Sequence, residues 1–160
     1  MMSKVTNRYT DKELIEKIWI WCSDYNRIPT QRDILNDSRM STHHTYINRF
    51  GSIKESMKYA KIDTMTEIPS VHDTIKGLMD DSKCRFKIVD EFVNINNIIV
   101  DFKVVDKYGD IYYIDLVFLK NVHNEVLDFV KMYRNLQMGN EKYVMVSNIE
   151  DLALVLYNKN

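Results

Sequence analysis

The spacing of hydrophobic residues changes along the chain, from a helical period in the first part to runs typical of strands in the middle. Up to residue 62, apolar residues recur three or four positions apart. The pattern predicts four short helices, at about residues 11–26, 31–36, 42–49 and 52–61. Each begins at a residue that can accept a hydrogen bond from the helix backbone. These starts are Thr10 with Glu13, Thr30 with Asp33, Ser41 or Thr42, and Ser52.

The pattern after residue 70 predicts a mixed domain. A helix at 71–80 precedes three strands at 86–93, 98–105 and 111–119, which two short turns join into an antiparallel meander. A helix at 124–138, a strand at 143–146 and a helix at 149–157 follow. The predicted fold class is α+β. A helix-turn-helix-containing helical unit occupies residues 1–63. A linker at 64–70 and a small α/β domain at 71–160, ordered helix–β–β–β–helix–β–helix, come after it.

The composition of the chain argues against several classes of protein. The 45% hydrophobic content argues against disorder, and no apolar run reaches the length of a membrane span. The first residues lack a secretory signal, so a cytoplasmic location in a bacterial cell is expected. Cys22 and Cys84 are isolated and form no zinc pair. No membrane and no small-molecule cofactor are expected. Residues 1–63 carry a net charge of +3 and the rest −4, which favours approach of the first part to phosphate.

The third helix is the candidate recognition element. A helical wheel turns Phe50, Ile47 and either Tyr46 or His43 inward. The opposite side carries side chains that contact base edges and phosphates in protein–DNA complexes. With the basic residue just before the helix, the DNA-binding candidates are Arg39, Thr42, His44, Thr45, Asn48 and Arg49. The alternative is a solvated helix face that binds nothing.

Several strings in this region resemble the homing-endonuclease-associated repeat, a small helical DNA-binding unit. They are Tyr9-Thr10 with Leu14-Ile15, Ile28-Pro29-Thr30, Ser41-Thr42, Arg49-Phe50-Gly51-Ser52 and Ala60. The resemblance covers residues 9–62. This sequence has Ile53 where the family usually has Trp, and Lys61 where it has Gly. The resemblance implies binding to double-stranded DNA, by a protein of a phage or mobile element.

The predicted meander resembles the core of the PD-(D/E)xK nucleases, over residues 71–157. That core has one acid on its second strand and an acid-x-Lys on its third. Asp101 and Asp115 occupy the two acidic positions, but Val117 stands where the lysine is expected. Lys103, or alternatively Lys120, would take the place of that lysine, and Glu91 could supply a third oxygen. The resemblance implies that Asp101 and Asp115 hold Mg²⁺ and, with Lys103, catalyse DNA cleavage.

Three functions follow from these patterns. The first is a site-specific, homing-type endonuclease that uses a divalent metal. The second is a non-catalytic DNA-binding regulator. In that case the C-terminal domain forms a homodimer or binds a protein partner, and Asp101 and Asp115 are structural. The third is an interaction protein whose helical unit contacts protein.

Overall fold

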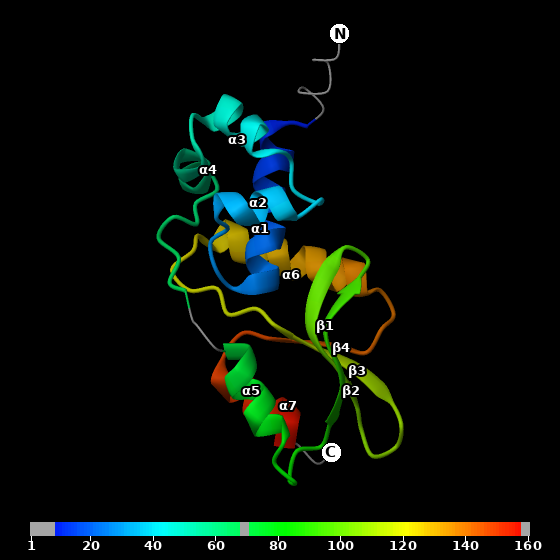
Figure 1. The fold of residues 1–160 in the computed structure, drawn as a ribbon. Coiled ribbons are helices and arrows are strands. Elements are labelled where there is room, and N and C mark those ends of the chain that lie inside the picture. Colours follow the sequence, from blue (N-terminus) through cyan, green and yellow to red (C-terminus); the bar gives the residue numbers. More distant parts are fainter. Residues whose placement is uncertain (1–8, 68–70, 158–160) are drawn as a thin grey trace. The chain divides into compact units, whose positions relative to one another are not determined.

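The computed structural model describes residues 9–67 and 71–157, which divide into two compact units (Figure 1). The N-terminal unit comprises Met1–Glu67 with Leu119–Val130. The C-terminal unit comprises Ile68–Phe118 with Lys131–Asn160. Helices and strands together confirm the α+β class. In the part of the chain described, no helix combines the length and the apolar character needed to cross a membrane.

The N-terminal unit begins with four short helices: α1 (Asp11–Tyr25), α2 (Gln31–Asn36), α3 (His43–Phe50) and α4 (Ile53–Tyr59). The predicted starts are confirmed. Thr10 and Thr30 each form a capping box, in which the side chains of the first and fourth residues bond each other's backbone N–H groups. Of the two alternatives at the third start, Thr42 is the cap, and Ser52 caps α4. Gly51 ends α3 at a φ of 101°, a conformation that side chains disfavour.

The core of this unit joins residues far apart in the sequence. Leu14, Ile18 and Trp19 of α1 are buried, and Trp19 donates a hydrogen bond from Nε1 to the Ala60 carbonyl at 2.6 Å. Tyr46 of α3 is fully buried, and its hydroxyl donates to the Leu14 carbonyl at 3.3 Å. These bonds satisfy the polar ends of two large aromatic side chains, so α1 serves as the support on which α3 and α4 rest.

A segment from much later in the sequence completes the N-terminal unit. Helix α6 (Asn124–Met138) begins in this unit, and its residues after Val130 belong to the other. The Phe129 ring lies 5.4 Å from that of Trp19. Lys61 pairs with Glu125 at 2.8 Å, and Thr66 forms an antiparallel bridge with Lys120. The predicted boundaries at 1–63, 64–70 and 71–160 stay a prediction, and residues 68–70 of the predicted linker lie outside the described residues.

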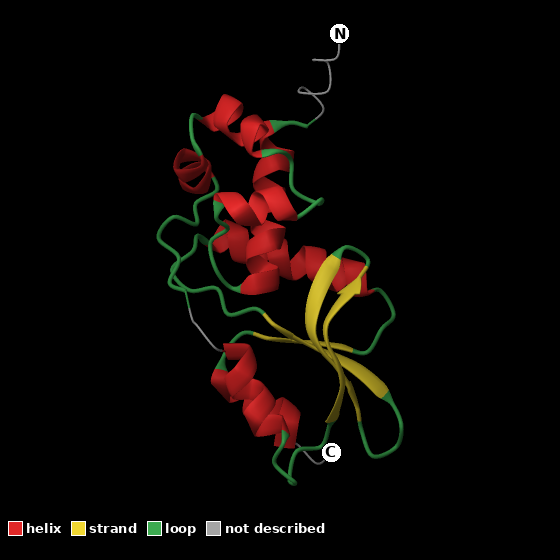
Figure 2. Cartoon of the chain, viewed as in Figure 1, coloured by secondary structure: helices red, strands yellow, loops and turns green. Residues whose placement is uncertain are grey.

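The C-terminal unit contains a four-stranded sheet in the order β1-β2-β3-β4 (Figure 2). Its strands are β1 (Lys87–Ile95), β2 (Ile98–Val105), β3 (Ile111–Leu116) and β4 (Tyr143–Val146). The first three form the predicted antiparallel meander. The meander is not the whole sheet, because β4 pairs with β3 in parallel. The prediction identified 143–146 as a strand but not its partner, since a parallel partner is set by the crossover through α6 rather than by a local turn.

Helices α5 (Val71–Met79) and α7 (Ile149–Tyr157) cover one face of this sheet (Figure 1). Ile75 and Met79 of α5 and Leu152 and Leu156 of α7 form a core with buried strand residues. The strand residues are Phe102, Val104, Ile114, Leu116 and Val146. Side chains alternate between the faces of a strand, so Asp115, between Ile114 and Leu116, points to the opposite face. There it meets Arg134, from the C-terminal part of α6.

Candidate nucleic-acid interface

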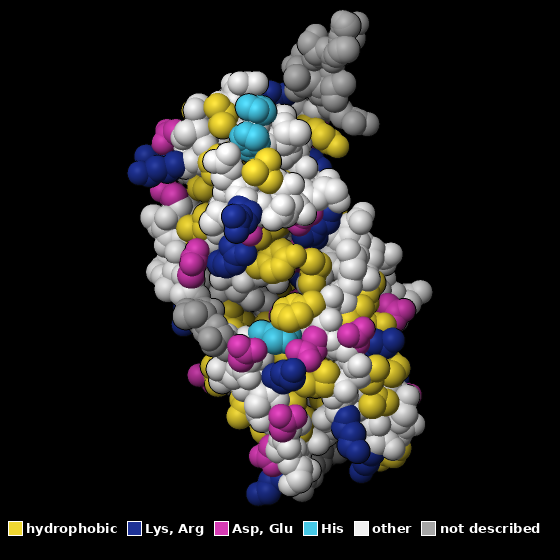
Figure 3. All heavy atoms as spheres, viewed as in Figure 1, with side chains coloured by type: hydrophobic (Ala, Val, Ile, Leu, Met, Phe, Trp, Pro, Cys, Tyr) yellow, Lys and Arg dark blue, Asp and Glu magenta, His cyan; other side chains and the backbone are white. Residues whose placement is uncertain are grey.

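Helix α3 presents a short polar face at the surface of the N-terminal unit. Thr42, His44 and Asn48 are exposed, and Thr45 is half-buried. The Thr42 side chain accepts from the Thr45 N–H, and the two threonine hydroxyls lie 3.0 Å apart. Histidine side chains lie at the surface over this helix (Figure 3). Three of the six predicted DNA-binding residues are therefore exposed on α3 or at its cap, and Thr45 is half-buried beside them.

The buried side of α3 is narrower than predicted. Tyr46 is fully buried and Phe50 is 8% exposed, which confirms two inward positions. Ile47 was expected inward and is 37% exposed, so that assignment is wrong. The helix has only eight residues, and the pair Tyr46 and Phe50, one turn apart, is enough to fill its contact with α1 and α4. Ile47 consequently belongs to the outer face with Asn48.

The two predicted DNA-binding arginines form ion pairs within the unit. Arg39 bonds the buried carboxylate of Asp24 at 2.6 Å and that of Asp37 at 2.7 Å. The Arg49 guanidinium bonds the Asp11 carboxylate and donates to the Tyr9 carbonyl. Neither guanidinium therefore has its full set of N–H donors available to a ligand. Their contacts hold the loop before α3 and the end of α3 to helix α1.

Two other basic residues of the N-terminal unit are more accessible to a DNA phosphate than Arg39 and Arg49. Arg32 and Lys54 are exposed, and neither forms an ion pair or side-chain hydrogen bond with any residue in 9–67 or 71–157. Each occupies the second position of its helix, after the caps Thr30 and Ser52. Sequence reasoning missed both. The available signal was the lack of an acidic residue three or four positions away on either helix, which leaves each charge uncompensated.

The four helices, their caps and the Arg-Phe-Gly-Ser junction correspond to one known helical unit. Residues 9–63 match the family model of the homing endonuclease associated repeat. This match confirms the resemblance predicted from the sequence and covers the first part of the chain only. The comparisons with curated proteins and with solved structures found no match. Within the matched residues, Arg32 and Lys54 are exposed, as are Thr42, His44 and Asn48 at α3, whereas Arg39 and Arg49 are bound by acidic residues of the same unit.

The predicted catalytic acids lie beside each other in the C-terminal unit, outside the repeat. Phe102 of β2 pairs with Ile114 of β3. Because the strands are antiparallel, the neighbouring residues Asp101 and Asp115 lie opposite each other. Both are buried, at 4% and 0% exposure. Burial raises the pKa of Asp115 to about 6, with a further rise from Asp101, against the lowering effect of the Arg134 guanidinium. Lys103 lies on β2 two residues from Asp101, so the two side chains share a face of the strand.

The carboxylate of Asp115 is already saturated by protein donors. Arg134 donates from Nε to Oδ2 at 2.6 Å and from Nη2 to Oδ1 at 3.0 Å, and the Tyr143 hydroxyl also donates to Oδ2. Oδ2 of Asp101 accepts from the Leu116 N–H at 2.7 Å. Mg²⁺ needs free carboxylate oxygens and room for water. Within the described chain, no three His, Cys, Asp or Glu side chains are arranged to hold a metal ion. These donors fit a divalent ion poorly.

His72 joins the other acids of this region. Its Nε2 lies 2.8 Å from Glu91 and its Nδ1 3.4 Å from Asp101, and its ring is stacked between Phe92 and Phe102. Burial lowers the pKa of His72, but the hydrogen bonds to Asp101 and Glu91 raise it, and the net shift is upward. Glu91, the predicted third oxygen, is thus held by His72 and also by Lys76 at 2.9 Å. Because His72 lies on α5, far from these strands in the sequence, no local pattern could show the cluster.

Proposed function

We propose that the protein binds double-stranded DNA through the repeat, with α3 as the element that reads bases. The observation that carries the proposal is the fixed outward face of α3. Tyr46 and Phe50 hold one side of the helix in the core, which leaves Thr42, His44 and Asn48 exposed on the other. An α-helix fits the major groove of B-DNA, and an asparagine can bond adenine there with two hydrogen bonds.

Phosphate contacts are assigned to Arg32 and Lys54, because these exposed cations are not engaged by acidic side chains. In the same proposal Arg39 and Arg49 act indirectly. Their ion pairs to Asp24 and Asp11 set the position of α3 on α1. A guanidinium that reads guanine would have to leave these partners first. This assignment changes the roles of two predicted contact residues but keeps α3 as the interface.

The test uses fluorescence anisotropy to measure duplex binding by the full-length chain over a range of salt concentrations. A preferred site is first selected from a random duplex library. Arg32→Ala and Lys54→Ala should weaken binding to all sequences and each reduce the salt slope by about one. Asn48→Ala should weaken the selected site about 5- to 150-fold and random duplex little, as expected for one base contact. The matched control is Lys83→Ala, which removes an exposed lysine of the C-terminal unit.

Two results would contradict this proposal. One is the lack of duplex binding at low salt, and the other is binding whose strength does not change with salt. Loss of binding in Lys83→Ala equal to that in Arg32→Ala would also move the interface away from the repeat.

The endonuclease function predicted from the sequence, metal-dependent cleavage at Asp101 and Asp115, remains a prediction. The poor fit of these carboxylates to Mg²⁺ favours the alternative, a DNA-binding regulator in which they are structural. The two alternatives differ in a nicking assay on the selected duplex with and without Mg²⁺. Cleavage that needs Mg²⁺ and disappears in Lys103→Ala without a change in melting temperature would establish the enzyme, whereas loss in Asp115→Asn counts only if that variant stays folded, because Asp115 is the buried partner of Arg134.

A further inference from the structure

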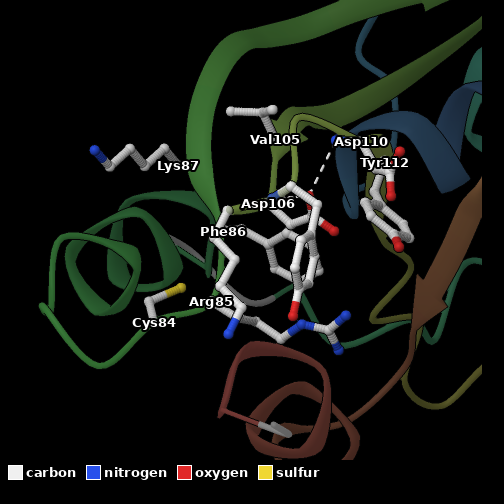
Figure 4. Close-up of a pocket in the computed structure, with 10 residues that line it drawn as sticks. Cys84, Arg85, Phe86, Lys87, Val105, Asp106, Asp110 and Tyr112 are labelled. Atoms are coloured by element: carbon white, nitrogen blue, oxygen red, sulfur yellow. Dashed lines mark hydrogen bonds between the residues drawn. The ribbon is translucent and has the colours of Figure 1, made fainter. Parts of the chain in front are cut away.

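A pocket lies in the C-terminal unit where the segment 84–87 approaches the β2–β3 hairpin (Figure 4). Its lining combines basic and aromatic side chains from both segments. Those that matter here are Arg85, Phe86, Lys107, Tyr108 and Tyr112. No residue of the repeat takes part, so the pocket is a feature separate from the proposed duplex interface.

Arg85 is held across this pocket by aromatic rings. Its guanidinium carbon lies 4.5 Å from the centre of the Phe86 ring and 6.0 Å from that of Tyr112. Figure 4 shows the side chain extending below Phe86, whereas Lys87 points away. Its backbone N–H donates to the Leu156 carbonyl, which fixes the base of the side chain. Over the described ranges 9–67 and 71–157, Arg85 forms no ion pair. Stacking orients a guanidinium while leaving its N–H groups available.

The hairpin supplies an exposed ring and a second cation. Tyr108 is 77% exposed, and the Lys107 ammonium lies 5.1 Å from its ring centre. Within the turn, the Asp106 side chain accepts hydrogen bonds from the Tyr108 and Asp110 N–H groups. Asp110 also lies 3.5 Å from Lys142, whose ammonium stands 5.1 Å from the Tyr112 ring. Asp110 and Lys142 offset each other, and Asp106 keeps its charge because its partners are neutral N–H groups, so with Arg85 and Lys107 the pocket still carries an excess of positive charge.

We propose that this pocket binds an unpaired segment of nucleic acid. A base stacks on Tyr108, and the flanking phosphates contact Arg85 and Lys107. Binding of single strands requires aromatic rings interleaved with cations. No cation alternates with the aromatic residues in the strand that contains Tyr112, but the fold brings Arg85 and Lys107 beside the rings of this pocket. An acidic peptide would use the cations and not the exposed ring, so the ring favours nucleic acid.

The experiment measures binding of the full-length chain to a fluorescein-labelled oligothymidine of about ten nucleotides, a length within the range of single-strand sites. The wild type should bind, and the affinity should fall with salt. Tyr108→Ala should weaken binding about tenfold, the order expected for the loss of one base–aromatic stack. Arg85→Gln should weaken it to a similar degree. Neither variant should change binding to the selected duplex.

Matched controls separate this pocket from the repeat and from misfolding. Leu154→Ala removes another exposed apolar side chain of the unit, 65% exposed against 77% for Tyr108, and Lys83→Gln removes a cation outside the pocket. Both should bind the oligonucleotide like the wild type. Arg32→Ala, in the repeat, should affect duplex binding alone. Because Tyr108 is exposed, Tyr108→Ala should retain the wild-type melting temperature.

The proposal is overturned if the wild type does not bind the oligonucleotide. It is also overturned if both pocket variants bind it like the wild type, since the repeat would then account for the binding. Displacement of the oligonucleotide by polyglutamate, together with unchanged affinity in Tyr108→Ala, would instead assign the pocket to acidic peptides. Failure of duplex binding with retained oligonucleotide binding would reject only the function proposed for the repeat.

Discussion

The guanidinium of Arg39 bonds, at 2.6 Å, the carboxylate of Asp24, a side chain with no exposed surface. The pair links the loop before α3 to helix α1. Removing one member of a buried ion pair leaves an uncompensated charge in the interior, which costs about 3–5 kcal/mol. We therefore expect Arg39→Ala to unfold the N-terminal unit or lower its melting temperature sharply. Circular dichroism on heating measures the effect, with Arg32→Ala as the control that should melt like the wild type.

The result for Arg39 also decides between two roles. If Arg39→Ala melts like the wild type and still loses duplex binding, the arginine contacts DNA directly, as its position before α3 suggested. If it is destabilised and Arg39→Lys is destabilised less, the arginine positions α3.

The Asp115–Arg134 pair should be just as critical in the C-terminal unit. Both side chains are fully buried, and the guanidinium forms two hydrogen bonds with the carboxylate. Arg134→Met is expected to destabilise the unit by about 3–5 kcal/mol in urea denaturation, because Asp115 then has no cation. Adding Asp115→Asn to Arg134→Met should restore part of the lost stability, because the buried carboxylate charge is then removed together with the guanidinium. Lys142→Met, which removes an exposed ion pair with Asp110, should have little effect.

Phe50 should be necessary for the small core of the N-terminal unit. Its ring is 8% exposed and lies 5.2 Å from that of Tyr59. Phe50→Ala should cost roughly 3–5 kcal/mol through lost burial and the cavity it leaves. A unit of this size has little stability to spare, so thermal denaturation should show its loss. Tyr59→Ala, which truncates the more exposed ring of the pair, should be much milder. Equal melting temperatures for Phe50→Ala and the wild type would show that the α3–α4 junction is packed differently.

The stability of the C-terminal unit should depend on the charge of His72. Its pKa is raised above its ordinary value of 6.5 by Asp101 and Glu91. A group with a raised pKa stabilises the fold fully below its unfolded pKa, and this contribution is lost as pH rises through the folded pKa. The melting temperature of the wild type should thus fall relative to that of His72→Gln as the pH is raised from below the unfolded pKa of about 6.5 to above the folded pKa. A difference that stays constant over this range would show that His72 does not change its charge on folding.

Local signals predicted most of the secondary structure. The cap residues Thr10, Thr30 and Ser52 act on the backbone within three positions, so the sequence alone shows where α1, α2 and α4 begin. Asn96 and Asn97 adopt positive φ angles at the predicted turn between β1 and β2. Interactions of this range need no knowledge of the rest of the fold.

The partners of charged residues could not be predicted in this way. Arg49 pairs with Asp11, 38 positions earlier, and Arg134 with Asp115, 19 positions earlier. A helical wheel shows which side of α3 carries Arg49 but not that Asp11 lies within its reach. For Arg32 and Lys54 the sequence shows only that no acidic residue lies three or four positions away; the lack of a distant partner, such as those of Arg49 and Arg134, is seen only in the fold.

Helix α6 bears on how the repeat could be transferred between genes. Residues 119–130, which include the first half of this helix, complete the N-terminal unit and are encoded after the strands β1 to β3. A gene fragment that ends after the matched region at residue 63 would encode the repeat without Phe129, the ring against Trp19. Recombination at that boundary would therefore transfer the repeat with an incomplete core. A protein that received it would have to supply side chains in place of those from the first half of α6.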